Sequence, residues 1–133
     1  MKARIVILIS ILAGGGDFAT GLMLLGAPAQ ALALMGVPAV REVVWIRYIG
    51  VFVACVGISY FGGLLSWWDR GSQTRLRVVW EFTALFRGMV GTFVGVEILL
   101  RALQPGWLTV VATDWFWALL QAILLRGRFF EVL

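Results

Sequence analysis

The chain has 133 residues, of which 62% are hydrophobic and 14% charged, with a mean hydropathy of +0.97. Soluble domains have about 45–50% apolar and about 25% charged residues, so this composition excludes a soluble fold and indicates one integral membrane domain over residues 1–133. The net charge of +4 does not indicate nucleic acid, because no basic run is interleaved with aromatic residues. There is no histidine and only one cysteine, which excludes histidine ligation of a metal or haem by this chain and an internal disulfide.

Four segments are apolar and long enough to cross a membrane as helices, which takes about 20 residues. The polar turn WWDRGSQTR (67–75) and the break QPG (104–106) separate the second, third and fourth of them. The sequence therefore predicts an all-α fold, an integral membrane four-helix bundle with spans at residues 4–26, 43–66, 76–100 and 107–126.

The connection between the first two spans, residues 27–42 (APAQALALMGVPAVRE), is only mildly apolar. Pro28 suits the first turn of a helix and Gly36 suits a helix end. We therefore expect a short interfacial helix, followed by a helical restart at Pro38. An irregular loop is the alternative for this segment.

Lysine and arginine gather at one end of the spans, and loops rich in these residues stay in the cytoplasm. We therefore expect both termini in the cytoplasm, and the apolar run up to Gly26 as a span instead of a cleaved signal peptide. Tryptophans are expected in a belt at each surface, with Trp67, Trp68 and Trp80 on one side and Trp45 and Trp107 on the other. The cytoplasmic side holds Lys2, Arg4, Arg70, Arg75, Arg77, Arg126 and Arg128, and the opposite side holds Arg41 and Arg101.

Three ionisable residues fall deep inside the predicted spans, and a fourth, Arg47, lies higher. At a rise of about 1.5 Å per residue, Asp17 lies about 20 Å, Arg87 about 16 Å and Asp114 about 18 Å from the cytoplasmic ends. These depths are close to the midplane of a hydrocarbon layer about 30 Å thick. Arg47 lies about 28 Å up, with a side chain long enough to reach toward Asp114. We expect Asp17 to pair with Arg87, and Asp114 to bridge Arg87 and Arg47.

Each predicted helix has one face of small and ionisable residues, and on the first, third and fourth the opposite face is bulky and apolar. Small residues let membrane helices approach closely, so the bundle is expected to be polar inside and apolar outside. The inner faces carry Ser10, Ala13, Gly14, Asp17 and Gly21; Arg47, Gly50, Ala54, Gly57 and Phe61; Glu81, Ala84, Arg87, Gly88, Gly91 and Gly95; and Asp114, Ala118, Gln121 and Ala122.

The intramembrane network of Asp17, Arg47, Arg87 and Asp114 has two interpretations. Its charges nearly balance, so it could be a closed set of salt bridges that fixes helix register. Alternatively it is a proton-linked or substrate-binding site, since ionisable residues inside membranes are functional candidates.

Glu81, Trp117 and Gln121 are candidate pocket-lining residues. Gln121 is expected on the inner face, and Glu81 near the cytoplasmic interface, paired with Arg77. Trp117 belongs to the aromatic cluster DWFWALLQ (114–121), which is either packing or a slot for a lipid, quinone or pigment. The sequence shows no nucleophile–base pair, metal-ligand cluster or nucleotide motif. We therefore assign no catalytic or metal-binding residue and no intrinsic cofactor, and expect no enzyme acting alone.

Several motifs together resemble the DoxX-like group of small bacterial four-helix membrane proteins. They are Pro28, MGVP (35–38), IRYIG (46–50) with Gly57 and Tyr60, LFRG (85–88) and TDWFWALLQAILLR (113–126). The resemblance spans most of the chain. It implies a four-helix bundle in the bacterial inner membrane and association with membrane redox systems, since the original DoxX-type proteins are linked to quinone-reducing oxidoreductases.

Three functions follow from these observations. The first is a non-catalytic accessory subunit of a larger electron-transfer or photosynthetic membrane complex, in contact with lipids and with other membrane subunits or further copies of itself. The second is a small proton-coupled transporter that works as an oligomer. The third is a quinone-linked redox component of DoxX type that depends on Arg47 and Asp114.

Overall fold

A computed structural model describes residues 2–127, 129 and 130, and Arg70 by its backbone alone. Arg128, used above for the orientation, lies outside the described residues. Within them the fold is all-α, and four helical segments are long and apolar enough to cross a membrane. The predicted four-helix membrane bundle is therefore confirmed. Its elements are α1 (Lys2–Gly26), α2 (Pro28–Leu34), α3 (Val43–Arg70), α4 (Thr74–Leu99), the 3₁₀ turn η1 (Pro105–Trp107) and α5 (Leu108–Arg126).

The short helix predicted between the first two spans is present as α2. Pro28 is its first residue, and Gly36 follows its end with a φ of 70°, a backbone conformation that glycine adopts without steric cost. The restart predicted at Pro38 is wrong, because α3 begins only at Val43. Val37 is buried among apolar side chains that include Ile46, which holds the chain in a non-helical connection up to α3.

Helices α1 and α3 form a tight pair whose backbones touch. A Cβ added to Gly21 would lie 2.5 Å from the backbone nitrogen of Ala54, and one added to Gly57 would lie 2.5 Å from that of Phe18. Only glycine leaves room for this approach. Helices α4 and α5 form the second pair, with Gly91 of α4 against Trp115 of α5.

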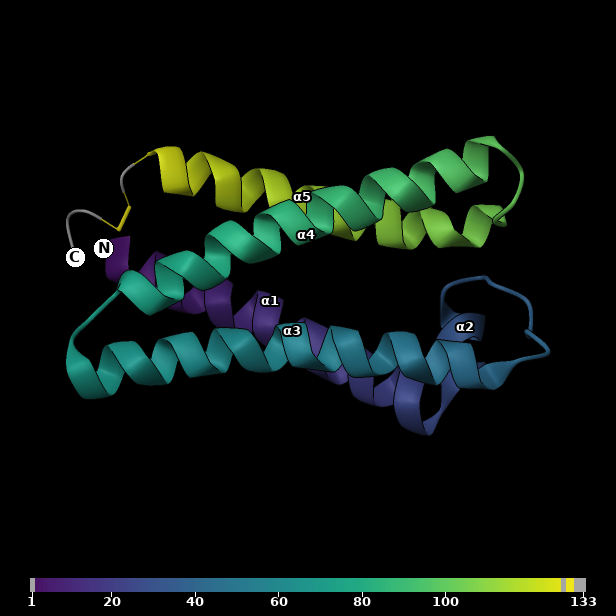
Figure 1. The fold of residues 1–133 in the computed structure, drawn as a ribbon, viewed down its shortest axis with the longest axis horizontal. Helices are drawn as coiled ribbons and strands as arrows, with labels where there is room; N and C mark the ends of the chain where they lie inside the picture. The colour runs from purple at the N-terminus through teal and green to yellow at the C-terminus, as the bar shows by residue number, and fades with distance from the viewer. Residues whose placement is uncertain (1, 128, 131–133) are drawn as a thin grey trace.

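The two ends of the bundle are different (Figure 1). The "Lys2 end" carries the start of α1, the turn 71–73 and the end of α5, and the "α2 end" carries α2 and the turn before η1. Each end has its own apolar core, and the middle of the bundle lies between them. The core at the Lys2 end contains Val6, Ala13, Tyr60, Leu76 and Trp80, and the core at the α2 end contains Leu24, Ala31, Leu32, Val37 and Ile46.

Trp80 is a core residue, so its assignment to the aromatic belt is wrong. Its side chain is completely buried, and its indole Nε1 donates a hydrogen bond to Ser10 Oγ at 2.9 Å. The reason is its spacing. Trp80 precedes Arg87 by seven residues, which is two helical turns, so both side chains share the inner face of α4. Trp68, by contrast, is exposed, as a belt residue should be.

Candidate functional site

Three ionisable side chains from three helices meet in the middle of the bundle. Arg87 of α4 donates from Nη1 to Asp114 Oδ1 of α5 at 3.0 Å, and from Nη2 to Asp17 Oδ2 of α1. Two of the three ion pairs expected for the intramembrane network, Arg87–Asp17 and Arg87–Asp114, are therefore present. We call Asp17, Arg87 and Asp114 the charge triad. It joins the two helix pairs, because Asp17 belongs to one pair and Arg87 and Asp114 belong to the other.

Small residues make room for the triad. Gly14 and Gly21 lie one turn before and after Asp17, and both are buried against α3. Gly91 lies one turn after Arg87, and a Cβ added there would meet Trp115 Cδ1 at 2.9 Å and Asp114 Cβ at 3.5 Å. Helix α5 therefore approaches α4 closely at this level, which brings Asp114 within reach of the guanidinium.

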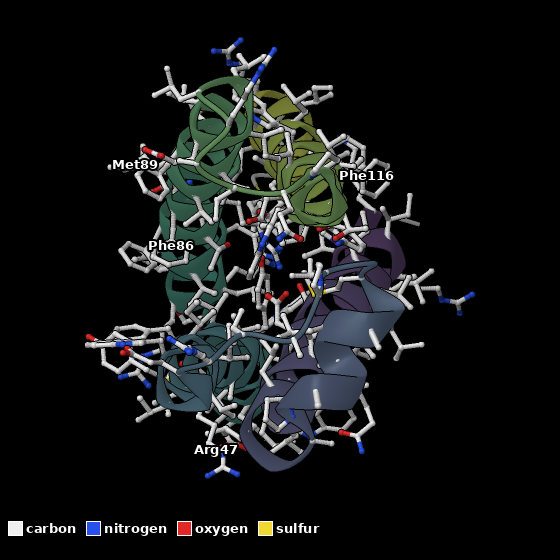
Figure 2. All side chains as sticks on the ribbon, turned by 90° about the vertical axis from the view of Figure 1, so that its right-hand side faces the viewer. Arg47, Phe86, Met89 and Phe116 are labelled. Carbon is white, nitrogen blue, oxygen red and sulfur yellow. The ribbon has the colours of Figure 1, made fainter. Side chains whose placement is uncertain are left out.

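Arg47 is not part of this site, and its predicted bridge to Asp114 is wrong. Its side chain is exposed and points away from the bundle (Figure 2). The inner face of α3 runs through Ile46, Gly50 and Gly57. Residue 47 lies about 100° around the helix from Ile46. Arg47 is also only one turn from the start of α3, where a long side chain reaches polar surroundings at little cost.

Because Arg47 lies outside the site, the charges of the site do not balance. One guanidinium, which is always protonated, faces two carboxyl groups, so the triad carries a charge of −1 when both carboxyls are ionised. The side chain of Arg87 is 5% exposed, whereas those of Asp17 and Asp114 are 16% and 15% exposed. Within the described residues, the second oxygen of each carboxylate accepts no hydrogen bond and is not fully enclosed.

A second buried polar group lies next to the triad on the side of the Lys2 end. The Tyr60 hydroxyl donates to Thr83 Oγ1 at 2.8 Å, and Gln121 Nε2 donates to the Tyr60 hydroxyl and to Thr83 Oγ1, the latter at 3.3 Å. All three residues are completely buried. So are Ser10 and Trp80, which lie nearer the Lys2 end. We call these five residues the polar plug. All four long helices contribute to it.

The plug was only partly visible in the sequence. Gln121 was expected on the inner face and lies there. Thr83 was missed, although it precedes Arg87 by one helical turn and therefore shares its face. Tyr60 was noted only as part of the family resemblance, because its ring suits an interface as well as a core. The helical period could have indicated Thr83, but not the partner of either hydroxyl.

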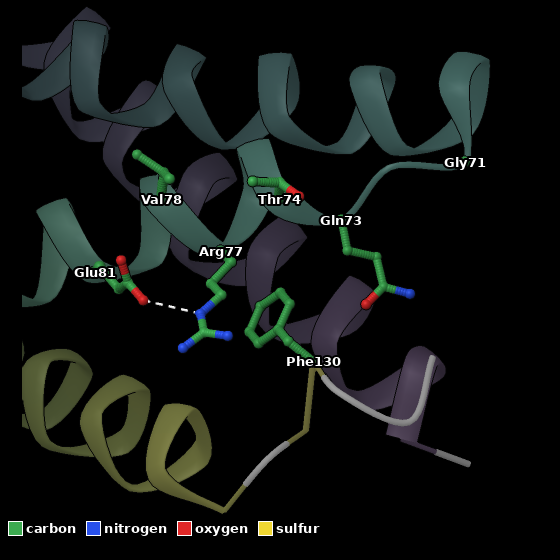
Figure 3. Close-up of a pocket in the computed structure, with 7 residues that line it drawn as sticks. All are labelled: Gly71, Gln73, Thr74, Arg77, Val78, Glu81 and Phe130. Carbon is green, nitrogen blue, oxygen red and sulfur yellow. Dashed lines mark hydrogen bonds and ion pairs between the residues drawn. The ribbon is translucent and has the colours of Figure 1, made fainter.

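Glu81 lies on the surface, apart from the completely buried Gln121, and Trp117 lies on α5 one helical turn before Gln121. Glu81 is half-exposed, pairs with Arg77 at 2.9 Å as expected, and lines a surface cavity at the Lys2 end (Figure 3). Gln121 belongs to the plug, and Trp117 packs on the apolar core. The cavity has a volume of about 620 Å³ and is lined by Gly71, Gln73, Thr74, Arg77, Val78, Glu81 and Phe130.

The bulky residues opposite the inner faces point outward, as expected. Figure 2 shows Phe86, Met89 and Phe116 directed away from the bundle, and Met89 and Phe116 are among the exposed side chains. Within the described residues, no group of three or more Asp, Glu, Cys or His side chains gathers as metal ligands. No family model, curated protein or solved structure matches the chain, so the triad and the plug have to be interpreted from their own chemistry.

Proposed function

We propose that this integral membrane protein is a small proton-coupled transporter and that its coupling proton binds at the charge triad. One observation carries the proposal: Arg87 lies between Asp17 and Asp114, while Arg47 is exposed elsewhere. An uncompensated charge in the middle of a membrane helix costs at least about 2.5–3.5 kcal/mol. Binding one proton makes the triad neutral and removes this cost, so a single exchangeable proton suits the site.

The same surplus carboxylate provides a way to couple the proton to a cationic substrate. A proton and a cation each neutralise the triad, and both together would leave it positively charged. Their binding is therefore mutually exclusive, which is the requirement for exchange. Asp17 and Asp114 belong to different helix pairs. If Arg87 released Asp17 and kept Asp114, one helix pair would therefore be free to shift relative to the other.

The infrared spectrum of the purified protein tests the proton. We expect the band of a protonated carboxyl group at neutral pH, because the triad favours one neutral carboxyl. Isotope labelling of aspartate should shift this band, and Asp17→Asn or Asp114→Asn should remove it. Asp69→Asn is the matched control, since Asp69 is exposed near the Lys2 end. Absence of the band from the unmodified protein would contradict proton binding.

Transport is tested with proteoliposomes that enclose a pH-sensitive dye. Addition of the lipophilic cation tetraphenylphosphonium to the outside should release protons from the triad and change the internal pH. The response should be lost in Asp114→Asn and kept in Asp69→Asn. If Asp114→Asn responds like the unmodified protein, the triad is not the coupling site.

The orientation is part of the proposal. The Lys2 end carries the described residues Lys2, Arg4, Arg75, Arg77 and Arg126, and the α2 end carries Arg41, Arg47 and Arg101. This asymmetry supports a cytoplasmic Lys2 end in a bacterial inner membrane. Cysteines introduced at the exposed turn residues Ser72 and Gln104 should then react with an impermeant thiol reagent on opposite sides, with Gln104→Cys labelled in intact spheroplasts.

An accessory subunit of a larger membrane complex is the second candidate. The wide exposed apolar surface of α4 and α5 supports it, since Phe82, Phe93 and Ile123 are each at least 60% exposed and would suit a protein neighbour as well as lipid. Purification in mild detergent should then recover stable partner chains, and a chain that purifies alone argues against it. DoxX-type quinone chemistry stays a prediction of the family resemblance.

A further inference from the structure

The polar plug is a barrier between the triad and the Lys2 end. Its five side chains are completely buried, and on α4 it extends from Thr83 to Trp80, four to seven residues before Arg87. That corresponds to about 6–10 Å of helix. Val6 and Leu76, which are also completely buried, pack in the same apolar core as Tyr60 and Trp80 of the plug. One continuous buried layer therefore separates the triad from this end of the bundle.

The hydrogen bonds of the plug end at backbone carbonyls. Thr83 Oγ1 donates to Val79 O at 2.7 Å, and Ser10 Oγ, which accepts from Trp80, donates to Val6 O at 2.8 Å. A helix carbonyl cannot pass a proton onward, and the five side chains include no carboxyl or imidazole group. The plug is therefore not a proton path toward the Lys2 end.

The α2 end of the bundle is held by its connections, because a Cβ added to Gly106 would lie 2.5 Å from Gly36 O and Trp107 packs on the apolar core of this end. Within the described residues, every side-chain hydrogen bond between the two helix pairs lies at the triad or in the plug. Figure 1 shows α4 beside α1 and α3 at the Lys2 end and farther from them toward the α2 end. In the half of the bundle toward the α2 end, a Cβ added to Gly95 would meet Val111 at 3.8 Å and no other described residue beyond its own helix within 4 Å, so small groups can be added there.

Polar atoms of both the triad and the plug lack hydrogen-bond partners within the described residues. The carboxylate side chains of Asp17 and Asp114 remain 16% and 15% exposed, although the plug beside them is completely buried. Arg87 Nε of the triad and Gln121 Oε1 of the plug are buried and have no hydrogen-bond partner in the part of the chain that the structure describes. A buried donor and a buried acceptor of this kind are normally satisfied by ordered water, and the plug closes the route from the Lys2 end.

We infer that water reaches the charge triad from the α2 end and not from the Lys2 end. The bundle thus contains a half-channel whose floor is the triad and the plug. That the half-channel delivers the coupling proton rests on the proposed function, whereas the access of water to the triad does not. In this conformation the triad exchanges protons with only one side of the membrane.

Reaction of single cysteines with a charged, membrane-impermeant thiol reagent tests the inference in sealed vesicles. The native cysteine is first replaced by Cys55→Ser. Gly95→Cys, and Val110→Cys one turn before Asp114, report on the half-channel. Ser10→Cys and Ala13→Cys, at nearly isosteric buried positions, report on the closed side. Ser72→Cys and Gln104→Cys mark the Lys2 and α2 sides of each vesicle preparation, independently of the proposed orientation.

The unmodified protein supplies the matched control for lipid exposure. Cys55 is exposed on α3, but in the membrane it should face acyl chains, which a charged reagent enters only at a high cost in free energy. We expect Gly95→Cys and Val110→Cys to react at least about tenfold faster than Cys55, and only in vesicles that expose the Gln104→Cys marker. Ser10→Cys and Ala13→Cys should react only after denaturation.

Two results would overturn the inference. In the first, Gly95→Cys and Val110→Cys react as slowly as Cys55, whichever side of the membrane the reagent is added to. The other is reaction of folded Ser10→Cys or Ala13→Cys from the side of Ser72→Cys. Failure of proton binding is recognised separately, because it removes the infrared carboxyl band and leaves the pattern of thiol reactivity unchanged.

Discussion

Arg87 holds two carboxylates through different nitrogens, so the three members of the triad are not equivalent. Removal of one carboxylate leaves the other ion pair intact, with a balanced charge. Removal of the guanidinium leaves Asp17 and Asp114 together inside the bundle without any cation. A buried charge without its partner is far more costly than an absent pair.

We therefore expect Arg87→Ala to lower the free energy of unfolding by about 3–5 kcal/mol. Arg47→Ala is the matched control, because Arg47 is exposed and outside the triad; its effect should stay within about 0.5 kcal/mol. Reversible unfolding in mixed micelles measures both. Equal losses for the two variants would mean that Arg47 takes part in the site after all.

For single residues, the sequence predicts the depth of a side chain in the bundle but not its direction. Asp17, Arg87 and Asp114 could be matched because each lies at nearly the same depth, and depth follows from the helical rise alone. Arg47 could not be placed in this way. Its depth and its side-chain length allowed contact with Asp114, but the direction of its side chain depends on how α3 is rotated against α1, which only packing determines.

At the scale of the helices, glycine decides how closely α1 and α3 approach. The chain has 16 glycines, and they differ in what surrounds them. Gly21 and Gly57 lie against backbone atoms of the facing helix. An added Cβ at Gly16 or Gly62, on the same two helices, would meet no described residue beyond the nearby helix backbone within 4 Å. Gly16 and Gly62 are therefore matched controls for substitutions of Gly21 and Gly57.

Gly21→Ala and Gly57→Ala should each destabilise the protein by about 1–3 kcal/mol, because the added methyl group forces the two backbones apart. Gly16→Ala and Gly62→Ala should be neutral or stabilising by up to about 1 kcal/mol, since alanine is the better helix former. Thermal unfolding of the purified protein in detergent checks all four. A uniform response of the four variants would be inconsistent with the close α1–α3 contact.

At the scale of the whole molecule, side chains make the polar links between the two helix pairs, and their backbones approach each other at Gly63–Leu76 and Gly36–Gly106. Backbone contact holds α1 on α3, but the polar links between the pairs are Arg87–Asp17, Trp80–Ser10 and the contacts of Tyr60. They lie at the triad or nearer the Lys2 end. Loss of the Arg87–Asp17 link should therefore loosen the contact between the pairs on the α2 side of the triad, where the Gly36–Gly106 contact remains.

Spin labels on exposed positions of the α2 half can detect this motion. In a Cys55→Ser background, Asp17→Ala should broaden the distance distribution between labels at Val51 of α3 and Ala112 of α5. The distance between Thr20 of α1 and Val51 should not change. Asp114→Ala keeps the Arg87–Asp17 link and should leave both distributions unchanged. Equal broadening in Asp114→Ala would show that the Asp17 link does not join the pairs.

The sequence by itself determined the membrane class, the four spans, the short helix after the first span and the meeting of Asp17 with Arg87 and Asp114. Hydropathy, helical rise and helical period are local properties, and they are sufficient for those results. Only the tertiary structure decided that Arg47 lies outside, that Trp80 lies in the core, and that Tyr60, Thr83 and Gln121 close one side of the triad. Those features depend on the rotation of each helix and on the angle between the two pairs, and both are set by side-chain packing between segments far apart in the chain.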